Sequence, residues 1–177
     1  MVGHATTAAK STAAKSKGRA ALVIPMRALL VGCGLASALI TSAAAGPVED
    51  LPGYWTGVGS ITMSGGNTEQ LKCVVTYKVA GPSLKQNMRC ASAAYTINGV
   101  ADLDVRGDQV TGKWEEQTYA ATGEVTGRIV DGGFNLTIKG VTFTAGMTVS
   151  GTNCKQQIAI TPTGLEVAKI SIGLGKC

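Results

Sequence analysis

The sequence predicts an all-β domain, a small antiparallel meander β-barrel of about eight to ten strands that is stapled by disulfides. Three observations support this fold class. Short segments with apolar residues at every second position recur along residues 46 to 177, turn residues separate them about every 8 to 12 positions, and four cysteines lie in this part of the chain. Because exposed sheet edges invite aggregation, a meander that closes on itself is favoured over an open sheet.

The first 45 residues are predicted to direct export and to leave the mature protein. Residues 1 to 25 form a basic Ala, Lys, Thr and Ser extension that we expect to be disordered, with Met26 as an alternative translation start. Residues 26 to 45, helical or disordered by themselves, have the charged start, apolar core and small-residue end of a secretory signal peptide cleaved after Ala45. The apolar run from 28 to 40 is shorter than the roughly 20 residues of a membrane anchor. An organelle transit peptide would share the basic composition, but the apolar core favours export.

Cys33 lies in "LVGC", which has the residue types of a lipoprotein attachment box. The apolar run continues to Ile40, whereas such a box normally ends the run, so Cys33 is interpreted as part of the signal core rather than as a lipid site. Cleavage also removes five of the sixteen Lys and Arg residues, and the remaining eleven balance eleven Asp and Glu. We therefore expect a periplasmic or secreted domain without a membrane span, whose neutral charge argues against nucleic acid as a partner.

Two disulfides are predicted in the mature chain. An even number of cysteines in an exported protein is typical of disulfides, and the four are Cys73, Cys90, Cys154 and Cys177. No C-x-x-C pair occurs, and the single histidine, His4, precedes the domain. We therefore expect no metal site and no cofactor.

The hairpin around Cys73 gives the first pairing. Apolar residues alternate along "LKCVVTYKV", and the turn sequence "AGPS" follows. A hairpin centred on this turn places Cys73 directly opposite Cys90, where the β-carbons lie at a separation that a disulfide can bridge. The same register places Lys78 opposite Lys85, which argues against it.

Cys154 and Cys177 are then expected to pair by elimination, across a second hairpin that turns near "TPTG". The apolar residues before this turn lie on the same strand face as Cys154. Those after the turn lie on the face opposite to that of Cys177. A bulge at Gly173 or Gly175 is therefore predicted to correct the register.

The other strands are predicted from alternation and turn residues. "YWTGVGSIT" opens the domain, Asn98-Gly99 is predicted as a hairpin turn, strands cover about 109 to 117 and 119 to 130, and "DGG" from 131 to 133 turns the chain into "FNLTI". In "VTFTAGMTV", one face carries Val141, Phe143, Ala145, Met147 and Val149. Glycines inside strands indicate bends or close packing at barrel corners, namely Gly57, Gly59, Gly112, Gly123 and Gly127.

No catalytic constellation is recognisable, and we expect that the protein is not an enzyme. The domain lacks histidine and its cysteines are predicted to be oxidised, so a nucleophile with an adjacent base is excluded. Asp102 and Asp104 share a strand face, and Glu115, Glu116 and Glu124 are the other carboxylates considered. The ordinary interpretation of these acids is a solvated outer face. "RGD" from 106 to 108 is interpreted as a hairpin turn rather than as a cell-adhesion motif.

Three aromatic residues are the candidates for ligand binding: Trp55, Tyr77 and Trp114. The two tryptophans either close one end of the barrel or line a cavity. Packing in an ordinary core is the alternative, because aromatic residues dominate the cores of small domains.

The segment "LPGYWTGVGSI" resembles the first strand of calycin-type barrels, the lipocalins and related protease inhibitors, which carries Gly-x-Trp, here Gly53-x-Trp55. This resemblance covers one strand, and it implies a calycin-like barrel with a cavity for a small apolar ligand. More broadly, Gly57-x-Gly59, Glu69 to Cys73, Tyr77, "LKQNMRCAS" and "VTGKWEE" resemble a family of small uncharacterised exported proteins of alphaproteobacteria, of the rhizobial type. That resemblance covers most of residues 51 to 150 and implies export and fold without catalytic residues.

The leading hypothesis is a non-enzymatic exported barrel that binds a small apolar ligand or a protein of the envelope. A protease-inhibitor-like module that acts through a terminus or a loop is the alternative, and a carboxylate-dependent hydrolase is the third hypothesis. An apolar cavity beneath Trp55 or Trp114 would favour ligand binding, whereas a solid core would argue against it.

Overall fold

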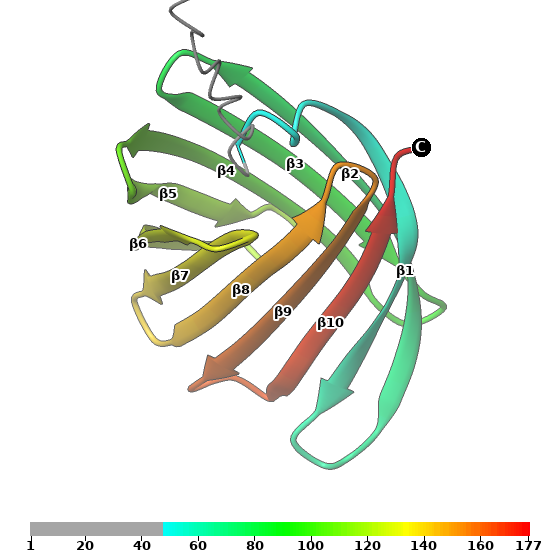
Figure 1. Ribbon diagram of the computed structural model, residues 1–177. Coiled ribbons are helices and arrows are strands. Elements are labelled where there is room, and N and C mark those ends of the chain that lie inside the picture. Colours follow the sequence, from blue (N-terminus) through cyan, green and yellow to red (C-terminus); the bar gives the residue numbers. More distant parts are fainter. Residues whose placement is uncertain (1–47) are drawn as a thin grey trace, which may run out of the picture. The chain divides into compact units, whose positions relative to one another are not determined.

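Ten antiparallel strands close into a barrel in the computed structural model, which describes residues 48–177 (Figure 1). The strands are β1 (Gly53–Met63), β2 (Thr68–Ala80), β3 (Ser83–Ala91), β4 (Thr96–Arg106), β5 (Gln109–Glu116), β6 (Ala121–Val130), β7 (Gly133–Gly140), β8 (Thr144–Thr152), β9 (Lys155–Thr163) and β10 (Val167–Gly175). Each strand pairs with the next along the chain, and β1 pairs with β10. The predicted all-β meander barrel is confirmed, with the largest strand number of the predicted range.

The predicted N-terminal extension, signal peptide and Cys33 lie outside the described residues. Within residues 48–177, no helix is long and apolar enough to cross a membrane.

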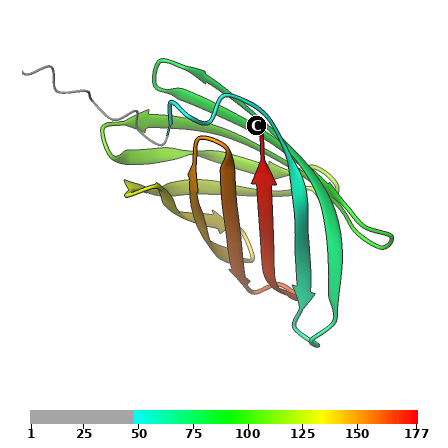
Figure 2. The same ribbon diagram turned by 45° about the vertical axis from the view of Figure 1, so that its right-hand side comes forward.

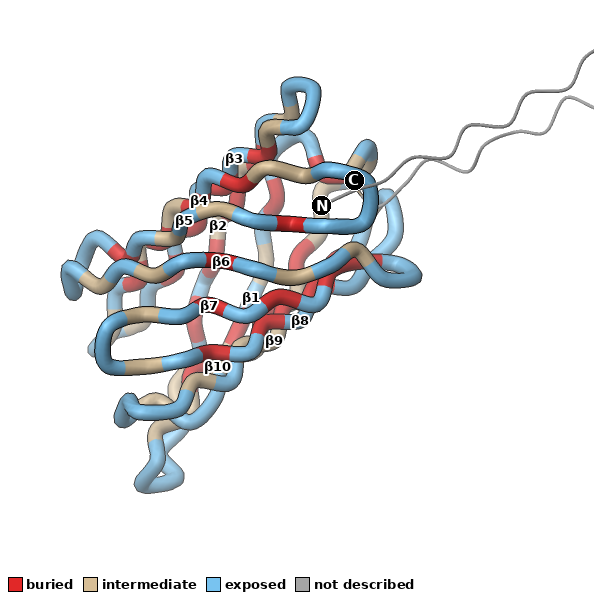
Figure 3. Tube along the Cα trace, turned by 90° about the vertical axis from the view of Figure 1, so that its left-hand side faces the viewer, coloured by how far each residue is buried: buried red, intermediate tan, exposed pale blue. Residues whose placement is uncertain are grey.

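Buried residues alternate with exposed ones along the strands (Figure 3), and the buried ones form the core of the barrel. In β7, for example, Phe134, Leu136 and Ile138 are buried, whereas Asn135 and Thr137 between them are exposed. Successive side chains of a strand point to opposite faces, so the apolar alternation of the sequence becomes an apolar interior and a polar exterior.

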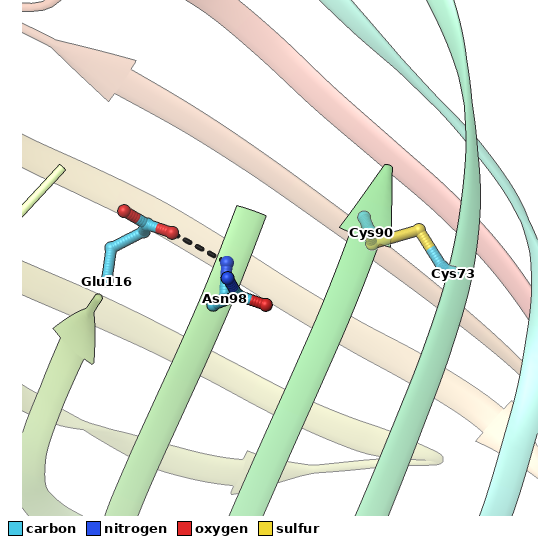
Figure 4. The surroundings of a disulfide bond; sticks show 4 residues. All are labelled: Cys73, Cys90, Asn98 and Glu116. Carbon is cyan, nitrogen blue, oxygen red and sulfur yellow. Dashed lines mark hydrogen bonds between the residues drawn. A yellow bond between two sulfur atoms is a disulfide. The ribbon is translucent and has the colours of Figure 1, made fainter. Parts of the chain in front are cut away.

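The predicted Cys73 hairpin is confirmed residue by residue. Cys73 lies opposite Cys90 in the pairing of β2 with β3, and the two form a buried disulfide with Cα atoms 4.1 Å apart (Figure 4). Lys78 lies opposite Lys85, as the register requires. The neighbouring strand β4 reduces the repulsion between these two lysines, because the Lys85 Nζ lies 2.9 Å from a carboxylate oxygen of Asp102.

The second predicted disulfide, Cys154 with Cys177, is also confirmed, with Cα atoms 5.2 Å apart. The predicted bulge at Gly173 or Gly175 is wrong. Strands β9 and β10 pair without interruption as far as Gly175 opposite Lys155, and the two cysteines lie beyond that last pair. Since they are outside the ladder, its alternation does not restrict them. An irregularity lies instead between Thr62 and Met63, where β1 pairs with β10.

The prediction of a hairpin turn at Asn98-Gly99 is also wrong, because both residues lie inside β4. The chain turns earlier, where the Ser92 Oγ accepts hydrogen bonds from the backbone N–H groups of Ala94 at 3.2 Å and Tyr95 at 3.0 Å. A side-chain acceptor that satisfies two successive N–H groups stabilises a tight turn without a residue at positive φ.

Val141 does not share the buried face of β8. It is 95% exposed in the turn before that strand, whereas Ala145, Met147 and Val149 are buried as predicted. The alternation of the sequence begins three residues before β8, in the turn where the chain reverses direction, so the first position of the pattern lies outside the sheet.

The "RGD" segment forms the predicted hairpin turn between β4 and β5, with Gly107 at a φ of +61°. Both of its charged residues are engaged on the barrel's outer face. Arg106 donates hydrogen bonds to Asp104, and the Asp108 carboxylate lies 3.1 Å from the Arg128 guanidinium.

Glycines inside strands mark close contacts between neighbouring strands, as predicted. A β-carbon at Gly57 would overlap the carbonyl oxygen of Gly173, and one at Gly112 would overlap that of Asp102. The strands approach most closely where one of them has no side chain.

We predict that Gly57→Ala lowers the free energy of unfolding by about 1–3 kcal/mol, because its methyl group would force β1 away from β10. The matched control is Gly146→Ala, at an exposed position of β8 where nothing lies within 4 Å of an added β-carbon. We expect this control to be neutral or slightly stabilising. Urea unfolding of both variants tests this, and equal effects would show that the close strand approach at Gly57 is unimportant.

Candidate functional site

The two ends of the barrel differ in how they are filled. One end, called here the closed end, carries residues 48–52 before β1 and the C-terminal Cys177 after β10 (Figures 1 and 2). The other, called the open end, carries only the short turns 64–67, 92–95, 117–120, 141–143 and 164–166. Within residues 48–177, segments that precede the first strand or follow the last one therefore lie at the closed end.

Trp55 lies at the closed end, where it is 1% exposed. Its indole N–H donates a hydrogen bond of 2.8 Å to the carbonyl of Leu51, in the segment before β1. From the C-terminal side, the Lys176 Nζ lies 4.9 Å from the centre of the indole ring and donates a hydrogen bond to the carbonyl of Asp50. The two ends of the described chain are thus tied together over Trp55.

Tyr77 fills the interior next to Trp55, with the two rings edge to face and their centres 6.4 Å apart. Its hydroxyl donates to the Gln156 side-chain oxygen at 2.7 Å and accepts from the Gln86 amide at 3.1 Å. All three side chains are buried, and burial raises the pKa of Tyr77 to about 12. Trp55 and Tyr77 therefore lie in a packed end of the barrel.

The open end contains an apolar cavity of about 440 Å³. Its wall includes side chains from most strands and from the turns at this end. Aliphatic residues form most of the lining, and the four aromatic residues are Tyr95, Trp114, Tyr119 and Phe143. Among the residues that the structure describes, the charged members of the lining are Glu116 and Glu166.

Trp114 is the one sequence-predicted ligand-binding residue that lines this cavity. Its ring packs edge to face against Phe143, with centres 6.0 Å apart. Its indole nitrogen lies near Gly99, where an added β-carbon would approach it to 3.4 Å, and Gly123 lies opposite Trp114 in the neighbouring strand. Glycines on both sides leave room for the large ring inside the barrel.

Glu116, which the sequence did not single out for ligand binding, is a buried carboxylate in the cavity wall. It is 6% exposed. One carboxylate oxygen accepts from the backbone N–H of Asn98 at 2.6 Å (Figure 4), and the other accepts from that of Tyr119 at 2.7 Å. Glu116 lies two residues after Trp114 in β5, so both side chains are on the same face of the strand. This spacing is the signal that could have identified Glu116 as an inward residue.

Asp102 and Asp104 are engaged by different cations on the outer face. Asp102 pairs with Lys85, and Arg106 donates to both oxygens of Asp104, at 2.6 and 3.1 Å. These hydrogen bonds hold the pKa of Asp104 below its usual value.

Lysines also flank Asp102 and Glu124 on the outer face. In the register from β4 to β7, Lys113 lies opposite both of these acids, and Lys139 lies opposite Glu124. The exposed Glu115 lies opposite Val100 and Thr122. Within residues 48–177, no three His, Cys, Asp or Glu residues are grouped so that they could hold a metal ion. Asp102, Asp104 and Glu124 therefore each have a cation beside them.

No protein-family model and no curated protein matches the sequence. The barrel is similar to the S-type phycobiliprotein lyase CPES from Guillardia theta, at 14% identity and a TM-score of 0.54 over 73% of this chain and 90% of that one. It is also similar to Rv2717c from M. tuberculosis, at 13% identity and a TM-score of 0.57 over 76% of this chain and 99% of that one. A protein of unknown function from the DUF3598 family of Nostoc punctiforme matches at 14% identity and a TM-score of 0.54, over 73% of this chain and 48% of that one.

These likenesses show the fold alone, which is a closed antiparallel barrel. This fold is consistent with the resemblance of the first strand to calycin-type barrels. The resemblance to exported proteins of alphaproteobacteria stays a prediction, since no sequence match supports it.

We predict that the Tyr77→Phe variant is less stable than the wild type by about 1–3 kcal/mol near pH 8, because Gln86 and Gln156 each lose a buried partner. An unfolded tyrosine ionises near pH 10, whereas the pKa of folded Tyr77 is raised to about 12. The wild type alone therefore loses the stability of the neutral buried hydroxyl as the pH rises from about 10 towards 12. Urea unfolding near pH 8 and pH 11 should show the gap between the two proteins shrinking, and a constant gap would contradict this account.

Proposed function

We propose that this protein is an exported, non-enzymatic barrel that binds a small apolar ligand in the cavity at its open end. The observation that supports this proposal most directly is the cavity of about 440 Å³, whose lining is almost entirely apolar. Pockets that bind small molecules have volumes of about 300–1,000 Å³, with mostly apolar walls and a few polar groups that orient the ligand. The contrast with the packed end around Trp55 supports the open end as the binding site.

Ligand binding without catalysis is favoured by the state of the reactive side chains. Residues 48–177 contain no histidine, and their four cysteines form two disulfides. The Glu116 oxygens accept backbone hydrogen bonds, and Lys113 lies opposite both Asp102 and Glu124 on the outer face. One barrel of similar fold is named a lyase, but 14% identity carries no activity to this chain.

Export is supported by the disulfides, which are typical of oxidising compartments, together with the signal pattern of residues 26 to 45. We propose the periplasm as the destination. In that compartment a barrel with an apolar cavity could hold a ligand away from water during its transfer between membranes or proteins. An envelope protein is the alternative partner, whereas the protease-inhibitor hypothesis receives no comparable support from the described residues.

We predict that the full chain, expressed in a host that exports it, begins at Gly46 and contains no free thiol. Intact-mass spectrometry with and without reduction and alkylation measures both properties. A lipid on Cys33, a retained N-terminal segment or two free thiols would each contradict the proposed export route.

We predict that the full chain binds the apolar dye N-phenyl-1-naphthylamine at one site, with a rise in dye fluorescence. Ala121→Phe should weaken binding by about ten-fold or more, because it places a phenyl group in the cavity that Ala121 lines. The matched control is Ala91→Phe, the same change at an exposed position of β3, which should leave affinity unchanged. Equal affinity of the two variants, with both folded by circular dichroism, would argue against this cavity as the site.

A further inference from the structure

We infer that the ligand is a cationic amphiphile, an apolar chain with an amine or quaternary ammonium group. This inference rests on the proposed function, because it concerns the chemistry of the ligand that the open-end cavity binds. It follows from the charges and ring systems at that end of the barrel.

The cavity wall and the turns around its mouth offer no positive charge to an anionic ligand, and the nearest strand lysines, Lys139 and Lys169, are exposed next to the inward residues Ile138 and Ile170. Among the described residues, no Lys, Arg or His lines the cavity. The five turns that surround its mouth, 64–67, 92–95, 117–120, 141–143 and 164–166, also contain none of these residues. A fatty acid would therefore lose the hydration of its carboxylate without gaining a partner of opposite charge.

Carboxylates gather at the same end. Glu116 belongs to the cavity wall, and Glu166 lies exposed in the turn before β10. A third, Glu69, lies opposite the cavity residue Ile61 and accepts a hydrogen bond of 2.6 Å from the Ser92 hydroxyl. With no cation among the surrounding turns, these carboxylates attract a cation and repel an anion.

Glu116 has capacity left to bind a ligand. Each of its oxygens accepts one backbone hydrogen bond, whereas an ionised carboxylate offers about four acceptor positions. The backbone N–H groups of Asn98 and Tyr119 hold the carboxylate in a fixed place within an apolar wall. A ligand amine could therefore donate to a free position without displacing either of them, whereas a quaternary ammonium, which has no N–H group, would be attracted by the charge alone.

The aromatic lining adds a second attraction for a cation. Tyr95, Trp114, Tyr119 and Phe143 all belong to the cavity wall. The faces of aromatic rings attract cations, and clusters of such rings recognise quaternary ammonium groups in water. The closed end contains an intramolecular example of this interaction, the Lys176 ammonium over the ring of Trp55.

The test compares three probes with the same apolar chain and different head groups: decyltrimethylammonium, 1-decanol and decanoate. Isothermal titration calorimetry on the full chain measures each affinity. We expect decyltrimethylammonium to bind about ten-fold more tightly than 1-decanol, and decanoate to bind most weakly. Added salt should reduce the preference for the cation, because it screens the exposed carboxylate of Glu166.

Three variants locate the source of the preference. Glu116→Gln should lower the affinity for decyltrimethylammonium by about ten-fold and leave that for 1-decanol unchanged. Glu116 also accepts two backbone hydrogen bonds, so its replacement could disturb the fold. Glu166→Gln is therefore a second variant, at an exposed residue, and it should lower the affinity for decyltrimethylammonium by about two- to three-fold. Glu115→Gln is the control, because it removes the same charge from the adjacent residue, which is exposed on the outer face of β5.

The outcomes separate this inference from the function on which it rests. If 1-decanol binds as tightly as decyltrimethylammonium, or if decanoate binds most tightly, the ligand is not a cation and the apolar-ligand function stands. If none of the three probes binds, the proposed function fails and this inference fails with it. An equal loss of cation affinity in Glu115→Gln and Glu116→Gln would also overturn the assignment of the site.

Discussion

The pairing of β1 with β10 is the constraint on which the rest of the structure depends. It joins the first and last strands of the meander, so that the sheet has no edge and every strand has an inner and an outer face. Closure at this seam requires close contact, and Gly57 and Gly59 of β1 lie opposite Leu174 and Ile172 of β10. The core, the cavity and the difference between the two ends all follow from a ring closed in this register.

The two ends differ because, within residues 48–177, extra segments of chain cover only one of them. A ten-stranded ring is wide, so its interior stays empty unless large side chains fill it. At the closed end, Trp55 and Tyr77 fill the space, and the segments before β1 and after β10 cover them. At the open end, Trp114 and Phe143 belong to the wall, and short turns surround the mouth. The cavity is therefore the space that no such covering segment fills among the described residues.

Buried polar groups have different consequences at the two ends. Tyr77, Gln86 and Gln156 satisfy one another, so this network stabilises the packed interior. Glu116 is satisfied by backbone N–H groups, which keep its carboxylate in an apolar wall while leaving acceptor positions free. No buried side-chain nitrogen or oxygen within residues 48–177 lacks a hydrogen-bond partner. The buried charge of Glu116 is thus compatible with a stable barrel and with a ligand at the cavity.

Alternation, turn residues and cysteine number can be recognised along the chain, and they were enough to predict the fold class, the register of the Cys73 hairpin and both disulfides. Local patterns failed where position in the ring matters, as at Asn98, whose turn-like sequence is held inside β4, and at Val141, where the chain turns. The closed barrel was needed to show that Trp114, and not Trp55, lines the open-end cavity and that Glu116 belongs to the same wall. Closure brings together residues from strands that are far apart in the chain. Sequence periodicity predicts which face of a strand a residue occupies, but it does not predict which end of the barrel contains a cavity.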